Sequence, residues 1–393
     1  MSEFVRRPSG LEAFFIDLDS CGCNMTFHFY LKLDKRPDAK QLNKAFCRIL
    51  KSHSKMNLKY IDDMWYKADY IPECKEIEID GDDLCAYKPA HIDFYKHTVA
   101  INILHLTAND TWYLCFDFFH GAVDGRSGIQ FVYDFFDVLN GTHPTECEFL
   151  LSDCDIIHTD YKSRQKPKKN SFTIFPRCKP TNWLPCKNGE EKTYMLEKHA
   201  CTRAHAAKLS LAVGQIFSKK SAKMIIPVDI RKYANDNHKS LFGNLFVPIF
   251  VDAATVSKVD ELRSEIVQYV KHRSWLNKIA SNLFIYSKIS YKLRRSVIKF
   301  FLPIVMSSKK FIYCALVSPL GVINSQKLQC PDFSTQDVSV TFEAFPFAAF
   351  TIISLQYNDH TNVTVSWNSG RVPSKTASKL IKNIEKCIGE KAA

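Results

Sequence analysis

The stretch FDFFHGAVDG, residues 116–125, carries the strongest signal in this chain of 393 residues. The apolar segment Thr111–Phe119 has the length and composition of a buried strand, and it ends directly on His120. A histidine at the end of a buried strand favours neutral imidazole, which can act as a base near neutral pH. We therefore take His120 as a candidate general base. The alternative is a core histidine followed by Asp124 as a helix cap.

The pattern around this stretch predicts alternating strands and helices. Residues 97–106 and 111–119 are expected to pair as an antiparallel hairpin, because Ala108-Asn109-Asp110 between them is a turn signal. A helix is expected to begin near Ser127, and Gly125 gives the backbone freedom to turn into it. Earlier strands are predicted around 14–18, 25–33, 59–67 and 76–79. A helix capped by Asp38 should bury Leu42, Ala45, Phe46, Ile49 and Leu50.

The middle of the chain breaks this pattern and suggests a division into two lobes. Prolines and basic residues crowd the region before Asn188 and interrupt any helix. We expect an N-terminal lobe over residues 1–165, a crossover linker over 166–190 and a C-terminal lobe over 191–393. The second lobe is predicted to contain strands near 193–197, 222–228, 245–251, 311–317, 348–357 and 361–367, with helices near 203–213, 256–273 and 374–388.

Composition limits the partners and the compartment. The formal net charge is +12, which favours a phosphorylated cofactor, an acidic carrier protein or a membrane surface as partner. No aromatic ladder or zinc knuckle accompanies the basic residues, so no nucleic-acid partner is expected. The first ten residues lack the apolar core of a secretion signal, so we expect a cytoplasmic protein whose 14 cysteines are reduced thiols. No metal site is predicted.

Three ordered motifs resemble those of one superfamily. The stretch 116–125 is similar to the H-x-x-x-D-G signature of the chloramphenicol-acetyltransferase-like superfamily. The segments IPVDIR (226–231) and FGN (242–244) are similar to its P-V-D-L-R and F-G-N elements, and VSPLG (317–321) resembles its S-N-L-G loop. Order and spacing agree over roughly residues 10 to 390. The likeness is closest to the alcohol-acetyltransferase-like and condensation-domain-like branch.

The resemblance implies a fold and a reaction. The fold would be α/β (α+β), with two lobes that are each a mixed β-sheet flanked by helices, and with an active-site tunnel between them. The reaction would move an acyl group from acyl-CoA to a small-molecule hydroxyl or amine acceptor in a ternary complex. Coenzyme A thioester would be a co-substrate, and no cofactor would be bound permanently. The chain has no P-loop or G-x-G-x-x-G loop, so basic side chains would hold the nucleotide phosphates.

The resemblance also assigns roles to individual residues. His120 would take the proton from the acceptor, and Asp124 would pair with Arg231 to brace the histidine loop. Gly125 would serve the turn, and Asn244 would support the site. Ser318 would donate a hydrogen bond to the tetrahedral oxyanion.

Several departures keep two alternatives open. Phe119 stands where peptide-forming condensation domains carry a first histidine, Pro319 stands where the similar loop has asparagine, and no D-F-G-W-G segment occurs near the C-terminus. The segment 193–226 is short for the family and bears on the shape of the tunnel. One alternative is a condensation-type catalyst that takes its acyl group from a carrier-protein thioester. The other is a non-catalytic binding protein of the same fold.

The basic amphipathic segment Leu283–Phe301 has two interpretations. Its apolar residues would form one face, opposite a basic face that includes Arg294. Either the segment is a helix docked on the second lobe, or it makes peripheral contact with a membrane surface.

Overall fold

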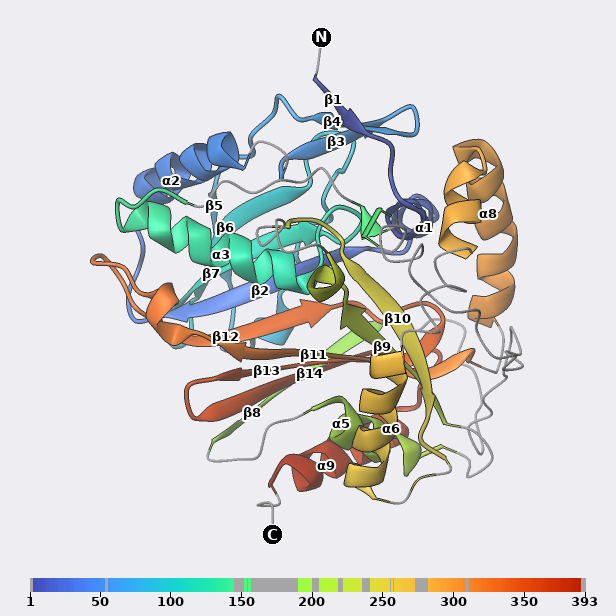
Figure 1. The fold of residues 1–393 in the computed structure, drawn as a ribbon. Helices are drawn as coiled ribbons and strands as arrows, with labels where there is room; N and C mark the ends of the chain where they lie inside the picture. Colours follow the sequence, from blue (N-terminus) through green and yellow to red (C-terminus); the bar gives the residue numbers. More distant parts are fainter. Residues whose placement is uncertain are drawn as a thin grey trace.

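The computed structural model describes residues 3–53, 56–144, 152–153, 155–156, 190–199, 205–217, 222–234, 241–254, 256, 258–272, 282–307 and 311–389. Two lobes lie one above the other in Figure 1, each built on a β-sheet. The N-terminus lies at the top of the upper lobe and the C-terminus at the bottom of the lower lobe. The predicted linker 166–190 falls almost entirely outside the described residues. None of the described helices combines the length and hydropathy needed to cross a bilayer.

The first lobe is a five-stranded sheet in the order β12-β2-β7-β6-β5, with α2 and α3 on one face and a small sheet β1-β4-β3 above it. The predicted hairpin is confirmed, since β6 and β7 pair antiparallel from end to end. The strands are β1 (Phe4–Arg6), β2 (Thr26–Leu33), β3 (Leu58–Ile61), β4 (Met64–Lys67), β5 (Lys75–Ile79), β6 (Val99–Leu106), β7 (Thr111–Phe119) and β12 (Thr335–Phe342). The helices are α1 (Gly10–Asp19), α2 (Ala39–Ser52), η1 (Leu84–Ala86) and α3 (Gly125–Leu139).

The second lobe is a six-stranded mixed sheet in the order β10-β9-β11-β13-β14-β8, with α5, α6 and α9 below it in Figure 1. Its strands are β8 (Glu191–His199), β9 (Lys223–Asp229), β10 (Phe246–Asp252), β11 (Tyr313–Ile323), β13 (Ala348–Tyr357) and β14 (His360–Asn368). Its helices are α5 (Ala206–Gly214), η2 (Arg231–Tyr233), α6 (Val259–His272) and α9 (Ser374–Gly389), whereas η3 (Ser325–Leu328) packs on α3 of the first lobe. The strands and helices predicted for this half are therefore present.

Three segments of the second half, η3, β12 and α8, pack with the first lobe, so the predicted division at residue 191 does not separate the two sheets. Strand β12, which the sequence pattern did not predict, pairs antiparallel with β2 along its length. Helix α8 (Tyr291–Ser307) packs on α1. At the seam His360 of β14 lies 2.7 Å from the carboxylate of Asp337 in β12, so polar side chains join the two sheets.

Residues 14–18, predicted as a strand, lie instead in the helix α1. Ser9 accepts a hydrogen bond from the backbone of Glu12, and the Glu12 carboxylate accepts one from the backbone of Ser9. This reciprocal capping box starts a helix. A short apolar run such as 14–18 does not distinguish a strand from a buried helix by its periodicity, so the capping residues decide.

The helices α2 and α3 pack against each other on one face of the first sheet. Asp38 caps α2 as predicted, and the five residues predicted to face inward are all buried. Helix α3 lays Phe131 and Phe135 across Phe116 of β7 in edge-to-face contacts. Strand β7 ends at Phe119 and α3 begins at Gly125. The packing of α3 on β7 therefore holds the intervening loop, with His120, at the end of this strand.

Candidate active site

His120 is held by its backbone from both lobes. Its N–H donates to the carbonyl oxygen of Met25 at 2.7 Å, which continues the pairing of β7 with β2. Its carbonyl oxygen accepts a hydrogen bond from the buried side-chain amide of Asn244 at 2.5 Å. The position of the imidazole is therefore set by one contact within the first lobe and one from the second.

Four phenylalanine rings surround the His120 imidazole. Phe15 stacks on it with ring centroids 4.4 Å apart, while Phe27, Phe246 and Phe342 lie 5.2–5.6 Å away. Burial among these rings lowers the pKa of His120 to about 4. Backbone contacts and the charge of Asp124 oppose this shift only in part. The imidazole is thus neutral at physiological pH, the state that a general base needs.

Both oxygens of the Asp124 carboxylate are fully engaged. One accepts from the backbone N–H of Ser127 at 2.8 Å and from Arg231 at 3.0 Å, and the carboxylate thereby caps α3. The other accepts from Arg231 at 3.0 Å and from the backbone N–H of Leu245 at 2.7 Å. A carboxylate with four such bonds has no free lone pair aimed at a substrate, so its geometry is that of a positioning group.

The predicted ion pair between Asp124 and Arg231 is confirmed, and it is bidentate. The two residues are 107 positions apart in the sequence. Arg231 follows β9 in the second lobe and also donates through Nε to the carbonyl oxygen of Leu241 at 3.1 Å. The planar guanidinium fork matches a carboxylate in a way that a lysine ammonium does not.

Ser127 is a site residue that the sequence analysis used only to mark the start of a helix. Its hydroxyl donates to the carbonyl oxygen of Gly243 at 2.9 Å and accepts from the N–H of Gly243 and from Arg231. Gly243 has a φ of 141°, a backbone conformation that favours glycine. No local spacing marks this role of Ser127, because the partners of its hydroxyl lie more than 100 residues away.

Gly125 is not required for the turn, contrary to the prediction. Its φ is not among the positive values, so the turn itself does not require glycine. A Cβ at this position would lie 2.7 Å from a methyl carbon of Leu320 in the second lobe. This methyl is the end of a flexible side chain, so an alanine here requires only that Leu320 shift.

A cavity of about 210 Å³ lies between the lobes at His120. The side chains that line it come from both sheets and include Asp124, Gly125, Arg231 and Ser318. Of the six predicted site residues, the structure thus brings five to this cavity, and the sixth, Asn244, binds the backbone of His120.

A second cavity of about 260 Å³ adjoins the first. Phe15, Ile225, Phe246 and Leu316 line both. Its remaining walls are all apolar and come from α1, β10 and the segments that lead into β11 and β13: Leu11, Phe14, Pro248, Phe250, Ile312, Tyr313, Phe345 and Phe347. We call this space the apolar annex. Its chemistry suits a hydrocarbon chain.

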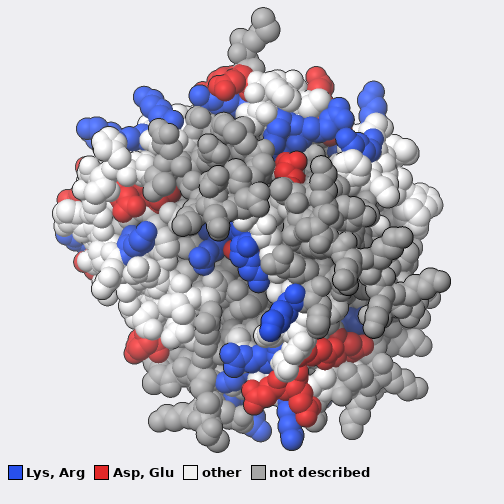
Figure 2. Space-filling model, viewed as in Figure 1, with Lys and Arg blue, Asp and Glu red and all other residues white. Residues whose placement is uncertain are grey.

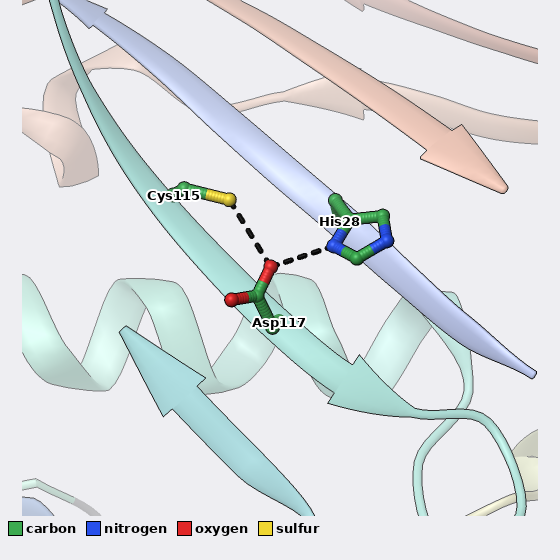
Figure 3. Close-up of side chains that lie close together, drawn as sticks. All are labelled: His28, Cys115 and Asp117. Carbon is green, nitrogen blue, oxygen red and sulfur yellow. Dashed lines mark hydrogen bonds and ion pairs between the residues drawn. The ribbon is translucent and has the colours of Figure 1, made fainter. Parts of the chain in front are cut away.

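The face of the first sheet that points away from α3 carries a buried polar cluster, which consists of His28, Cys115 and Asp117 (Figure 3). The carboxylate of Asp117 lies 2.6 Å from Nδ1 of His28 and accepts from the Cys115 thiol at 3.2 Å and from Asn102 at 2.8 Å. Two ligands of a tetrahedral zinc lie roughly 3.3 Å apart, given bonds of about 2.0–2.2 Å. The 2.6 Å separation is that of a hydrogen bond, so these side chains form a buried hydrogen-bonded network.

The Asp124–Arg231 pair generates a stability prediction. Asp124→Asn keeps the shape of the side chain but leaves the guanidinium without its buried counter-charge, so the free energy of unfolding should fall by about 3–5 kcal/mol. Urea denaturation followed by circular dichroism measures this. The matched control is Asp229→Asn, because Asp229 also lies 3.0 Å from Arg231 but its side chain is 46% exposed. Its loss should be about 1 kcal/mol or less. Equal losses of unfolding free energy in the two variants would show that the buried pair stabilises the fold no more than the exposed one.

Comparison with known proteins identifies the fold. No protein-family model matches the chain, and a search of curated proteins found no match. Among solved structures, the condensation domain from Monacolin K polyketide synthase MokA superposes with a TM-score of 0.61 at 10% identity, covering 98% of this chain and 97% of that one. The starter condensation domain of rhizomide synthetase RzmA, solved in complex with C8-CoA, superposes with a TM-score of 0.57 at 12% identity, covering 98% and 94%.

A third similar structure is polyketide synthase associated protein 5 from Mycobacterium tuberculosis, with a TM-score of 0.56 at 12% identity and 98% of each chain covered. Since each superposition covers nearly the whole of both chains, the similarity includes both lobes. At this level of identity the comparison speaks for the fold. The chain therefore has the two-lobe fold of these condensation domains.

Proposed function

We propose that this chain is an acyltransferase that moves an acyl group from acyl-CoA to a hydroxyl or amine acceptor, with His120 as general base. The observation that carries the proposal is a neutral imidazole that lines a cavity between the lobes. The neighbouring carboxylate of Asp124 is fully engaged in holding the loop. An uncharged base beside a positioning carboxylate suits proton removal from an acceptor.

In the proposed reaction, acceptor and thioester meet at the cavity without a covalent enzyme intermediate. His120 takes the acceptor proton while the acceptor oxygen or nitrogen attacks the thioester carbonyl carbon. The resulting tetrahedral intermediate carries a negative oxygen, toward which we assign Ser318 as donor. The carbon–sulfur bond then breaks, and the imidazolium returns the proton to the leaving thiolate. Asp124, Arg231, Ser127 and Asn244 position the base and do not exchange protons.

The first test is His120→Ala in a thiol-release assay with acyl-CoA and a panel of alcohols and amines. Loss of a general base should lower turnover by about 10²–10⁴-fold. Unchanged circular dichroism and unfolding would show that the variant keeps its fold. Turnover close to that of the unsubstituted chain would rule out His120 as the base.

A donor comparison in the same assay distinguishes acyl-CoA from a carrier-protein thioester. Nucleotide phosphates bound by exposed basic side chains should raise the affinity for acyl-CoA over that for acyl-pantetheine, and this advantage should shrink at high salt. Equal Michaelis constants for the two donors at all salt concentrations would mean that the nucleotide is not recognised. A carrier protein would then be the donor.

The lowered pKa of His120 predicts an unusual pH profile. A base acts only when unprotonated, so an imidazole with a pKa of about 4 stays active well below the ordinary histidine pKa of about 6.5. With an alcohol acceptor, kcat/KM should be level from about pH 5 upward and should fall only as pH approaches 4. An acid limb near pH 6.5 would contradict the buried, neutral base.

The apolar annex predicts a preference for acyl groups longer than acetyl. Each methylene that the annex takes out of water should contribute about 0.8 kcal/mol, or roughly fourfold in kcat/KM, until the annex is filled. Ile312 lines the annex but not the His120 cavity, so Ile312→Trp should reduce activity on octanoyl-CoA and leave activity on acetyl-CoA nearly unchanged. A flat chain-length profile in the unsubstituted chain would show that the annex does not hold the acyl group.

A further inference from the structure

Helix α8 packs on the protein through apolar residues that include Ile298 and Leu302, and through one buried charge, Arg294. Arg294 is 2% exposed, and its guanidinium lies 2.9 Å from Asp17 and 2.8 Å from Asp63. The hydroxyl of Tyr291, one turn earlier, lies 3.2 Å from that of Ser20. The sequence pattern placed Arg294 on a basic face, and one of its two interpretations docked the helix on the second lobe. Instead the helix docks on the first lobe, with a buried ion pair as its anchor.

The outer side of the same helix carries an apolar stripe. Leu293, Val297, Phe300 and Ile304 follow one another at spacings of four, three and four residues, which places them along one face. Their exposed fractions are 56%, 44%, 67% and 53%. A surface helix of a globular protein normally buries its apolar face and exposes its polar one. Helix α8 buries Leu302 on its inner side, yet this second apolar stripe stays exposed on its outer side, which suits contact with an apolar partner.

Basic residues accompany the stripe, and acidic residues are absent. Lys292, Arg295 and Lys299 are exposed on α8, and Lys288 precedes it. The sequence contains no Asp or Glu from residue 281 to residue 310. In Figure 2 the upper right edge of the molecule, where α8 lies in Figure 1, is drawn mostly white with Lys and Arg side chains beside it.

We propose that α8 binds the surface of an anionic phospholipid bilayer, with the stripe Leu293, Val297, Phe300 and Ile304 inserted among the headgroups. A helix lying in the interface combines an inserted apolar face with flanking Lys and Arg that contact lipid phosphates. The buried Arg294 pair would keep the helix attached to the protein while its outer face is in lipid. The inference is independent of the proposed acyl transfer, since it rests on the helix alone.

Charge favours a membrane over a second copy of the chain. In a two-fold symmetric contact the same patch meets itself, so the lysines and arginines of both helices would approach one another. Without an acidic residue in 281–310, nothing in this segment would offset their repulsion. A bilayer containing phosphatidylserine supplies negative charge and an apolar interior at the same surface.

The test is flotation of the full chain with vesicles of phosphatidylcholine alone and of phosphatidylcholine with phosphatidylserine in equal parts. Binding should be strong only with phosphatidylserine. Phe300→Gln should weaken it by about tenfold, because the ring no longer enters the lipid. Lys292→Gln with Lys299→Gln should weaken it by about fivefold for each charge, and less at high salt.

Matched controls distinguish binding through this surface from non-specific binding to vesicles. Val322→Gln removes an apolar side chain that is 57% exposed on β11, and Lys375→Gln with Lys379→Gln removes two exposed charges from α9 in the other lobe. Both should bind like the unsubstituted chain. No binding to either vesicle would overturn the proposal, as would binding that the Phe300 variant leaves unchanged. A chain that is dimeric in sedimentation and becomes monomeric on Phe300→Gln would assign the stripe to a second copy and also overturn it.

Discussion

The bidentate pair between Asp124 and Arg231 joins the first turn of a helix in one lobe to the end of a strand in the other. The same carboxylate caps α3 and accepts the backbone N–H of Leu245, so three requirements meet at one side chain. A charged pair with so little solvent access is stable only when its remaining hydrogen-bonding groups are satisfied. Ser127, Gly243 and Leu241 satisfy them, and in doing so they hold the two lobes in register across the cavity.

The position of His120 depends on this ion pair and its hydrogen-bond partners. Asn244, the neighbour of Gly243 in the sequence, donates a hydrogen bond to the carbonyl oxygen of His120. The phenylalanine rings around the imidazole come from α1, β2, β10 and β12. Four elements far apart in the sequence must assemble before the imidazole is desolvated. The pKa of His120 is therefore a property of the assembled lobes. Weakening the Asp124–Arg231 pair should change this pKa together with the stability of the fold.

Helix α8 and the apolar annex meet at α1. The inner face of α1 supplies Phe15 to the base and Leu11 to the annex, while Asp17 anchors α8. A contact of α8 with lipid would thus lie one helix away from the cavity where acyl transfer is proposed. This arrangement places an apolar surface and an apolar internal space on two sides of the same short helix.

The sequence by itself determined the strand–His–loop–helix unit, the β6–β7 hairpin and the buried face of α2, because these depend on periodicity, turns and caps within some twenty residues. Its motifs also pointed to Arg231 and Asn244 through resemblance to a family. Local pattern was insufficient for α1, where a capping box outweighed an apolar run, and for β12, which crosses into the other lobe. Only the tertiary structure decided the role of Ser127, the contact of Gly125 with Leu320 and the exposed apolar stripe of α8. Each depends on which distant side chain lies opposite, and residue spacing along one segment carries no information about that partner.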